Sequence, residues 1–213
     1  MSARCALGEV KGWSEMKFKL VKKVPIVEEN GVQWFYDTGF PHVETALNKG
    51  VQDFFGIPGL RMRGVGALKR YTKFNYAQNE IVTSDEPIPL AGGTTVPLEA
   101  RPSGWLVEMT VGGVKGLRYI DTGAAFSYVH ELSADYPSAG VVQECAFDGR
   151  PWDAPMRRVP CEFAGHAFEI HCADATVNPA YVPSEGVIGY DFFKAFTVVV
   201  DRVEGRMAFK KED

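Results

Sequence analysis

One tripeptide, Asp-Thr-Gly, occurs twice in this chain and constrains its fold more than any other feature of the sequence. The copies are Asp37–Gly39 and Asp121–Gly123, and each follows a short apolar run. Each run closes a stretch typical of a β-hairpin, with Asn30-Gly31 or Gly112-Gly113 at the turn. Both aspartates are therefore predicted to lie where a strand ends and a turn begins.

The composition favours a mostly β protein. The chain has 213 residues, which allows one large domain or two small ones. Its 22 glycines and 13 prolines, with short runs of Val, Thr, Phe and Tyr, are typical of strands joined by turns. A stretch rich in proline and glycine, residues 87–104, separates the two Asp-Thr-Gly copies. We therefore expect two lobes, residues 1–98 and residues 99–213.

The charge and hydropathy of the chain argue against several kinds of partner. The formal net charge is −4, so we expect no binding to nucleic acid or to an anionic membrane. No apolar run approaches the roughly 18 residues of a membrane span, and residues 1–10 lack the apolar core of a signal peptide. The sequence thus predicts a cytoplasmic protein. The basic run from Arg61 to Lys73 is interpreted as a solvated rim.

A second landmark follows each Asp-Thr-Gly. In the second half of the chain, Val187–Gly189 precedes a short helix-like run at residues 190–196. In the first half we align Gly66 with Gly189, because a similar order of strand-like runs follows both glycines. The phenylalanines of the helix-like run, Phe192, Phe193 and Phe196, have helical spacing and are predicted to lie in the core.

The two halves differ in length. Under this alignment the glycine lies 29 residues after Asp37 but 68 residues after Asp121, so the first half lacks roughly 39 residues. The additional residues of the second half include an apolar run at 141–147 followed by Asp148-Gly149, which predicts a further hairpin.

The string from Tyr119 to Val129, with residues 186–193 downstream, resembles a retropepsin-type aspartic protease. It matches two signatures of that family, an apolar pair before Asp-Thr-Gly-Ala and an apolar pair before a glycine that precedes a short helix. The resemblance is specific over about residues 105–210 and looser over about residues 16–84. It implies a bilobal pseudo-dimer of retropepsin-like β-barrel lobes, with the N-terminal lobe reduced, in which each lobe supplies one aspartate.

The chemistry of this family explains the tripeptide. Hydrolysis of a peptide bond without a metal or a covalent intermediate needs a base for water and an acid for the departing group. Two carboxylates that share one proton supply both, because like charges about 3 Å apart cannot both ionise. We therefore assign Asp37 and Asp121 as the catalytic dyad. No cofactor and no metal is required.

Neighbouring residues are assigned supporting roles. Glycine lets the backbone approach closely and turn tightly, and a threonine hydroxyl can tie the two loops together. The supporting residues are Thr38, Gly39, Thr122, Gly123 and Gly189.

The sequence departs from the family pattern in three ways. Phe40 follows the first tripeptide where the family has a small residue, so it either fills a substrate subsite or marks a lobe that has lost catalytic geometry. The shorter first half suggests that a single flap covers the cleft, formed by Phe147, Asp148, Gly149 and Arg150.

Neither tripeptide is followed by Ser or Thr, so no hydroxyl stabilises a charged carboxylate from that position. We therefore expect a less acidic pH optimum than in enzymes that carry it.

The resemblance implies an aspartic endopeptidase that acts as a monomer on an extended peptide or protein substrate. Two alternatives stay open. In the first, only Asp121 is catalytic and two chains pair through their C-terminal lobes. In the second, a catalytically inactive protease-like module binds peptides without cutting them. The four cysteines are predicted to be reduced thiols, and the sequence leaves open whether Cys145 and Cys161 pair.

Overall fold

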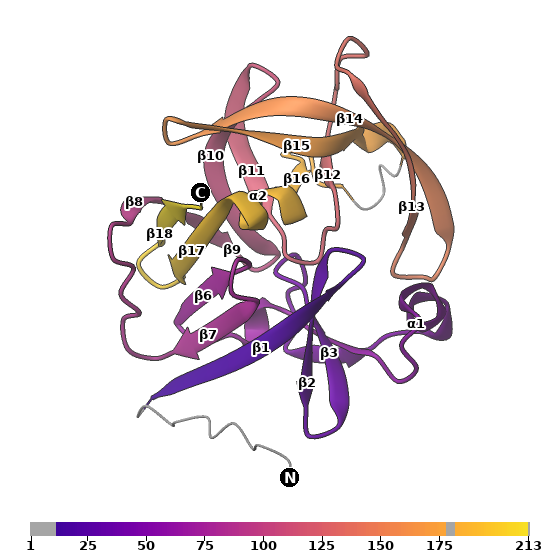
Figure 1. Ribbon diagram of the computed structural model, residues 1–213. Helices are drawn as coiled ribbons and strands as arrows, with labels where there is room; N and C mark the ends of the chain where they lie inside the picture. Colours follow the sequence, from indigo (N-terminus) through magenta and orange to yellow (C-terminus); the bar gives the residue numbers. More distant parts are fainter. Residues whose placement is uncertain (1–11, 178–181, 213) are drawn as a thin grey trace.

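The computed structural model describes residues 12–177 and 182–212, which form two β-sheets and two short α-helices (Figure 1). The first sheet contains β1 (Trp13–Val21), β2 (Val24–Glu29), β3 (Val32–Tyr36), β4 (Glu44–Ala46), β5 (Arg61–Arg63), β6 (Tyr71–Asn75), β7 (Glu80–Ser84), β8 (Thr94–Pro97), β17 (Phe196–Asp201) and β18 (Arg206–Lys211). The second contains β9 (Glu99–Arg101), β10 (Gly104–Val111), β11 (Val114–Ile120), β12 (Ser127–Val129), β13 (Ser138–Cys145), β14 (Pro151–Phe163), β15 (His166–Asp174) and β16 (Val187–Ile188). The helices are α1 (Lys49–Phe55) and α2 (Tyr190–Ala195), with 3-10 turns η1 (Val65–Ala67) and η2 (Ala175–Val177). The expected mostly β fold is confirmed.

The two hairpins that precede the aspartates form where the sequence predicts them. β2 pairs with β3 so that Glu29 lies opposite Val32, and Asn30 and Gly31 both have positive φ, at 53° and 76°. β10 pairs with β11 in the same manner, with positive φ at Gly112 and Gly113. Two consecutive residues of positive φ form the tight turn whose twist matches that of the flanking strands.

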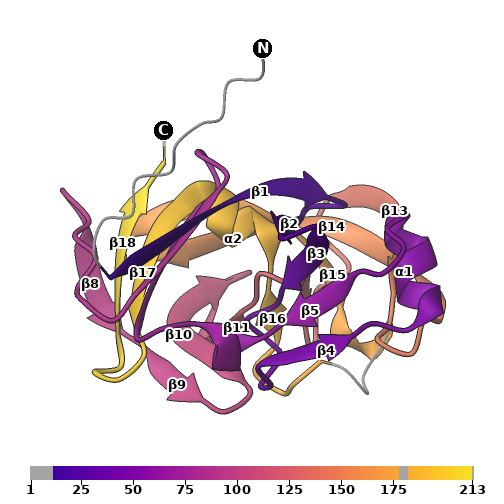
Figure 2. The same ribbon diagram turned by 90° about the horizontal axis from the view of Figure 1, so that it is seen from below.

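The C-terminal strands join the sheet formed by the first half of the chain. The first sheet has the order β4-β5-β3-β2-β1-β7-β6-β17-β18-β8, so β17 lies against β6 and β18 against β8. The second sheet has the order β13-β14-β15-β12-β16-β11-β10-β9. Figure 2 shows β17 and β18 at one end of the molecule and α1 with β13 at the other. The division into lobes at residues 98 and 99 stays a prediction.

A crossing segment passes each aspartate loop, and the prediction that Gly66 is the counterpart of Gly189 is wrong. β16 pairs in parallel with β11, and β5 pairs in parallel with β3. Val65 N–H donates to Phe40 O at 2.9 Å, as Tyr190 N–H donates to Ala124 O at 2.9 Å. The counterpart of Gly189 is therefore Gly64, two residues before the predicted Gly66. The apolar pair before Gly189 is replaced by Met62-Arg63, which concealed the correct register.

The core of the molecule is aromatic at its centre. The predicted core residues Phe192, Phe193 and Phe196 have no exposed surface. The Phe193 ring packs against Phe74 from the first half, at 5.7 Å between centroids, and Phe163 from β14 contacts Phe192 at 5.2 Å. Helix α2 thus buries its apolar face between strands from both halves of the chain.

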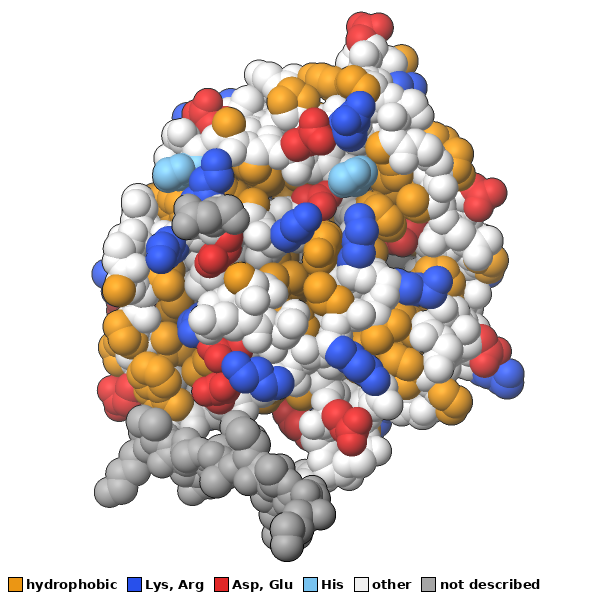
Figure 3. All heavy atoms as spheres, in the orientation of Figure 1, with side chains coloured by type: hydrophobic (Ala, Val, Ile, Leu, Met, Phe, Trp, Pro, Cys, Tyr) orange, Lys and Arg blue, Asp and Glu red, His pale blue; other side chains and the backbone are white. Residues whose placement is uncertain are grey.

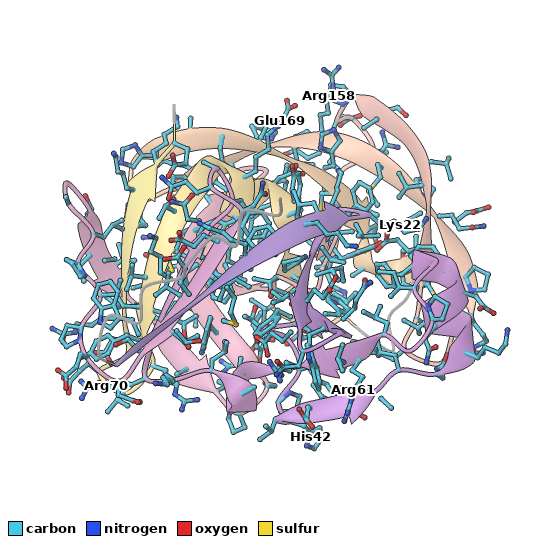
Figure 4. The ribbon with its side chains drawn as sticks, turned by 60° about the horizontal axis from the view of Figure 1, so that its bottom comes forward. Lys22, His42, Arg61, Arg70, Arg158 and Glu169 are labelled. Carbon is cyan, nitrogen blue, oxygen red and sulfur yellow. The ribbon has the colours of Figure 1, made fainter. Side chains whose placement is uncertain are left out.

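The basic run from Arg61 to Lys73 does not form a free cationic patch. Each of its basic side chains forms an ion pair with a carboxylate, and Figure 4 shows Arg61 and Arg70 at well-separated positions. On the face drawn in Figure 3, positive and negative side chains are interspersed. This distribution is that of an ordinary solvated surface.

Three of the four cysteines lie in the described ranges, and all three are free thiols. Cys145 is half-buried, whereas Cys161 and Cys172 are buried. Cys5 lies outside the described residues. No helix within residues 12–177 and 182–212 is long and apolar enough to cross a membrane.

We predict that Gly64→Ala and Gly189→Ala each destabilise the fold. A methyl group at Gly64 would collide with the carbonyl oxygen of Phe40, and one at Gly189 with that of Ala124, because both crossings bring backbone against backbone. We expect a loss of about 2–4 kcal/mol in the free energy of unfolding, measured by urea titration. Gly116→Ala is the control, since its methyl group would meet only the flexible end of Arg118. A Gly64→Ala protein as stable as the control would contradict the assigned crossing.

Candidate active site

The two aspartates occupy equivalent positions at the ends of β3 and β11. Asp37 N–H donates to Arg63 O at 2.9 Å, and Asp121 N–H donates to Ile188 O at 2.9 Å. In each loop the N–H three residues later, at Phe40 or Ala124, returns to the aspartate carbonyl at 3.3 Å. Two loops far apart in the sequence therefore have the same local geometry.

The threonines of the two tripeptides hold the loops together. Thr38 N–H donates to the Thr122 hydroxyl at 3.1 Å, and Thr122 N–H donates to the Thr38 hydroxyl at 3.0 Å. Each hydroxyl also donates to a carbonyl of the opposite loop, Thr38 to Ile120 O at 3.2 Å and Thr122 to Tyr36 O at 2.9 Å. Both threonines are 1% exposed, so these bonds are shielded from water.

The side chains of Asp37 and Asp121 meet at the centre of this arrangement. They lie within hydrogen-bonding contact of each other. Gly39 N–H donates to Asp37 Oδ1 at 2.8 Å and to Asp121 Oδ1 at 3.0 Å, and Gly123 N–H donates to Asp121 Oδ1 at 2.7 Å. A side chain at Gly39 would collide with Asp121, and one at Gly123 with Asp37. Glycine is therefore required at both positions for the carboxyls to approach.

Burial and proximity disfavour the state in which both carboxyls are ionised. Burial raises the pKa of both aspartates above the usual carboxyl range. For Asp37 the charge of Asp121 is the next largest cause, and the pKa of Asp37 lies well above its usual value. Backbone N–H groups oppose the rise, with Gly123 and Gly39 both acting on Asp121. The pair retains one proton in a pH range where an exposed aspartate has none.

The dyad lies between two cavities. One, of about 140 Å³, is bounded by both aspartates and by apolar side chains of β3 and α1 such as Phe35 and Val51. The other, of about 360 Å³, is bounded by both aspartates, Ser103 and Tyr119. Both cavities are therefore adjacent to the two carboxyls.

The predicted flap is the β13–β14 hairpin, whose turn reaches α1 (Figure 1). Phe147 lines both cavities beside the dyad. Gly149 lies against Gly50, and the Asn48 side chain donates to Phe147 O. Asp148 and Arg150 pair with each other in the exposed turn, with Arg150 Nε at 2.7 Å from Asp148 Oδ2. Of the four predicted flap residues, Phe147 is the one that faces the dyad.

Phe40 does not disturb the first loop. Its side chain is half-buried and packs toward the His42 ring, with 5.0 Å between centroids, and toward the Phe147 ring, at 6.4 Å. Its carbonyl accepts the crossing hydrogen bond from Val65, as the carbonyl of Ala124 does from Tyr190 in the other loop. The bulky side chain is thus accommodated outside the loop.

Several residues of the site were not predicted from the sequence. Glu144 and Trp152, opposite each other on β13 and β14, line the smaller cavity, as do Tyr128 of β12 and Lys22 from the β1–β2 turn. Asn48, which caps α1 through Val51 N–H, also binds the flap. An Asn before a helical run is a recognisable cap, but nothing local indicates its contact with residue 147. Among the described residues, no cluster of three or more His, Cys, Asp or Glu could hold a metal ion.

Comparisons with known proteins add little to this geometry. No protein-family model matches the chain, and no curated protein matches it. Among solved structures, the crystal structure of basic 7S globulin from soybean is similar, with 10% sequence identity, a TM-score of 0.49 and coverage of 95% of each chain. A similarity at this level assigns neither a family nor an activity. Function is therefore inferred from the geometry of the two aspartate loops.

We predict that Thr38→Val and Thr122→Val each lower the free energy of unfolding by about 2–3 kcal/mol. Each change keeps the shape of the side chain but leaves a buried N–H and a buried carbonyl of the other loop without a partner. Thr95→Val, at an exposed position of β8, is the control. Urea unfolding measures the difference. The double variant should lose less than the sum, because both hydroxyls join the same two loops; full additivity would contradict this mutual arrangement.

We also predict that Asp121→Asn stabilises the protein at neutral pH. Because the folded-state pKa values of the dyad are raised, the folded protein binds more protons than the unfolded chain within the raised window. The free energy of unfolding must fall as pH rises through that window. An amide keeps the acceptor for Gly39 and Gly123 and donates to Asp37 without a charge.

The expected gain is about 1–2 kcal/mol at pH 7, and it should shrink as the pH falls toward 4. Urea unfolding across this pH range measures it, with the exposed Asp135→Asn as control. A variant less stable than wild type at pH 7 would show that the carboxyls do not repel each other.

Proposed function

We propose that this protein is an aspartic endopeptidase in which Asp37 and Asp121 activate one water molecule for attack on a peptide carbonyl. The observation that carries the proposal is the contact between two buried carboxyls of one chain, each with a raised pKa. A pair that holds one proton contains a base and an acid at the same place. Few structural roles require two carboxyls to be buried against each other without a cation.

The reaction follows from the shared proton. The ionised carboxylate removes a proton from water as the water oxygen attacks the carbonyl carbon, while the protonated carboxyl donates its proton to the carbonyl oxygen. The resulting diol collapses when its C–N bond breaks: the first carboxyl gives its proton to the departing nitrogen, and the second carboxylate takes a proton from one diol hydroxyl as that oxygen becomes the new carbonyl. The dyad then holds one proton again. Gly39 and Gly123 hold the carboxyls through their N–H groups and leave the opposite face of the dyad to water and substrate.

We further propose that the molecule is a single-chain pseudo-dimer, with residues 1–98 and 99–213 each contributing one loop. The matching hydrogen bonds of the two loops and the parallel crossings β3–β5 and β11–β16 support an internal twofold arrangement. The meeting of Asp37 with Asp121 in one chain favours a monomeric enzyme over a homodimer that uses two copies of Asp121. The β13–β14 hairpin, with Phe147 beside the dyad, is suited to cover a bound peptide.

Peptide cleavage tests the proposal. Wild-type protein should cleave members of an unbiased library of quenched fluorescent peptides between pH 3.5 and 8. Asp37→Asn and Asp121→Asn should each lower kcat/KM by at least about 100-fold, because each removes a proton-transfer group. Asp135→Asn, an exposed aspartate, is the control and should behave as wild type. We expect the pH–rate maximum above about 3, since burial raises the pKa of both aspartates and the charge of Asp121 raises that of Asp37 further.

Other outcomes separate the alternatives. Turnover that survives both dyad substitutions would contradict the proposal. Specific activity that rises with protein concentration would favour a homodimer. Peptide binding without cleavage at any pH from 3 to 8 would assign the fold to a binding module.

A further inference from the structure

The smaller cavity beside the dyad has apolar walls and a polar end. Its walls include Val24, Phe35 and Val51 from the first half of the chain. Its volume of about 140 Å³ is roughly ten times the 10–15 Å³ that one enclosed water needs. It can therefore accept a long substrate side chain whose backbone lies over Asp37 and Asp121. This inference rests on the proposed function, and it concerns which side chain the cavity selects.

The polar end is formed by three side chains of the second half. Glu144 of β13 lies directly opposite Trp152 of β14, so both project from the same face of the hairpin. Tyr128 of β12, which is 6% exposed, packs its ring against Trp152 at 6.5 Å between centroids. The Tyr128 hydroxyl and the Trp152 N–H are enclosed, and neither makes a hydrogen bond of good geometry. Buried polar atoms need hydrogen-bond partners, and here the partners can come from within the cluster or from a bound ligand.

Glu144 has no cation of its own among the described residues. The nearby lysines come from the β1–β2 turn, yet Lys22 Nζ lies over the Phe54 ring at 4.2 Å and Lys23 Nζ over the Phe126 ring at 3.9 Å. Lys22 also lines the cavity, but in the described parts of the chain both lysines act on Glu144 through their charge and not through a hydrogen bond. Burial raises the pKa of Glu144 to about 7, opposed by the Tyr128 hydroxyl and by the charges of Lys23 and Lys22.

Together, Glu144, Tyr128 and Trp152 can accept further hydrogen bonds but have no donor left to offer. The Trp152 N–H can donate to the Tyr128 oxygen, and the Tyr128 hydroxyl can donate to Glu144. Once these donors are used, the free positions are the lone pairs of the Glu144 carboxylate and of the Tyr128 oxygen. We propose that the cavity binds a long basic side chain of the substrate, lysine or arginine, with Glu144 as the residue that determines this specificity.

Other side chains fit the cavity less well. An acidic side chain would meet Glu144 and the dyad, which all carry or share negative charge. A purely apolar side chain would fill the walls but leave the remaining lone pairs of the Glu144 carboxylate without a donor. A lysine satisfies both parts, because its four methylene groups match the walls and its ammonium group donates up to three hydrogen bonds.

The test uses peptide pairs that differ only in charge. Peptides carry either lysine or norleucine, its uncharged analogue of equal chain length, at each position in turn. Wild-type protein should cleave the lysine member with a kcat/KM roughly 10–100 times higher at one position, as expected for a hydrogen-bonded charge. Glu144→Gln should lower this lysine-to-norleucine ratio by a similar factor. Glu169→Gln, on the outer side of β15 (Figure 4), is the matched control and should keep the wild-type ratio.

Three outcomes would overturn the inference. These are equal cleavage of both members at every position, preference for norleucine, or an equal loss on both members in Glu144→Gln, which would make Glu144 structural. If wild-type protein cleaves no peptide, the proposed function fails, and calorimetric binding of the same pairs at pH 7.5 decides the inference independently. Tighter binding of the lysine member, lost in Glu144→Gln and kept in Glu169→Gln, would uphold it. Equal binding of both members would refute it.

Discussion

Thr38 and Thr122 each accept a hydrogen bond from the backbone of the other's loop and donate one back to it. Neither loop can satisfy these groups alone, because every partner lies more than 80 residues away in the sequence. The exchange fixes the distance between the two chain segments that carry Asp37 and Asp121. Burial raises the pKa of both carboxyls, and the charge of Asp121 raises that of Asp37 further, which costs stability at neutral pH. The buried threonine hydrogen bonds offset that cost, so the geometry of the site and the cohesion of the fold have one origin.

The parts of the fold that local chemistry determines were predictable from the sequence. Asn30-Gly31 and Gly112-Gly113 define their hairpins because few other pairs adopt positive φ at both positions. The first crossing glycine was misplaced by two residues for a tertiary reason. Arg63 stands where Ile188 stands in the other half, and its guanidinium lies over the Trp34 ring at 3.8 Å and pairs with Glu29. Arg63 is thus held by stacking and charge pairing where Ile188 is held by apolar burial. The sequence therefore has no apolar pair before Gly64 that would mark this glycine.

The aspartates and their threonines and glycines were predictable because one tripeptide carries all three roles. The cavity beside them was not. Its polar end combines β12, β13 and β14, and its apolar walls come from β2, β3 and α1 together with residues of the second half such as Ala125 and Val187. Glu144 lies in a strand whose residues alternate between the two faces of the sheet. Nothing in the neighbouring sequence distinguishes it from a glutamate exposed to solvent. Its character arises from burial against Tyr128 and Trp152, which only the pairing of distant strands produces.

The two halves of the chain differ in length, and they contribute different parts of the site. The second half supplies the β13–β14 hairpin, the polar end of the smaller cavity and part of its apolar wall, whereas the first supplies α1 and the apolar residues of β2 and β3. The hairpin turn also meets α1 through Asn48 and through the close approach of Gly149 to Gly50. Two second halves paired in a homodimer would have two hairpins and two copies of Asp121 but no α1, so the smaller cavity would lose the apolar residues that β2, β3 and α1 contribute. The smaller cavity therefore needs residues from both halves of the chain.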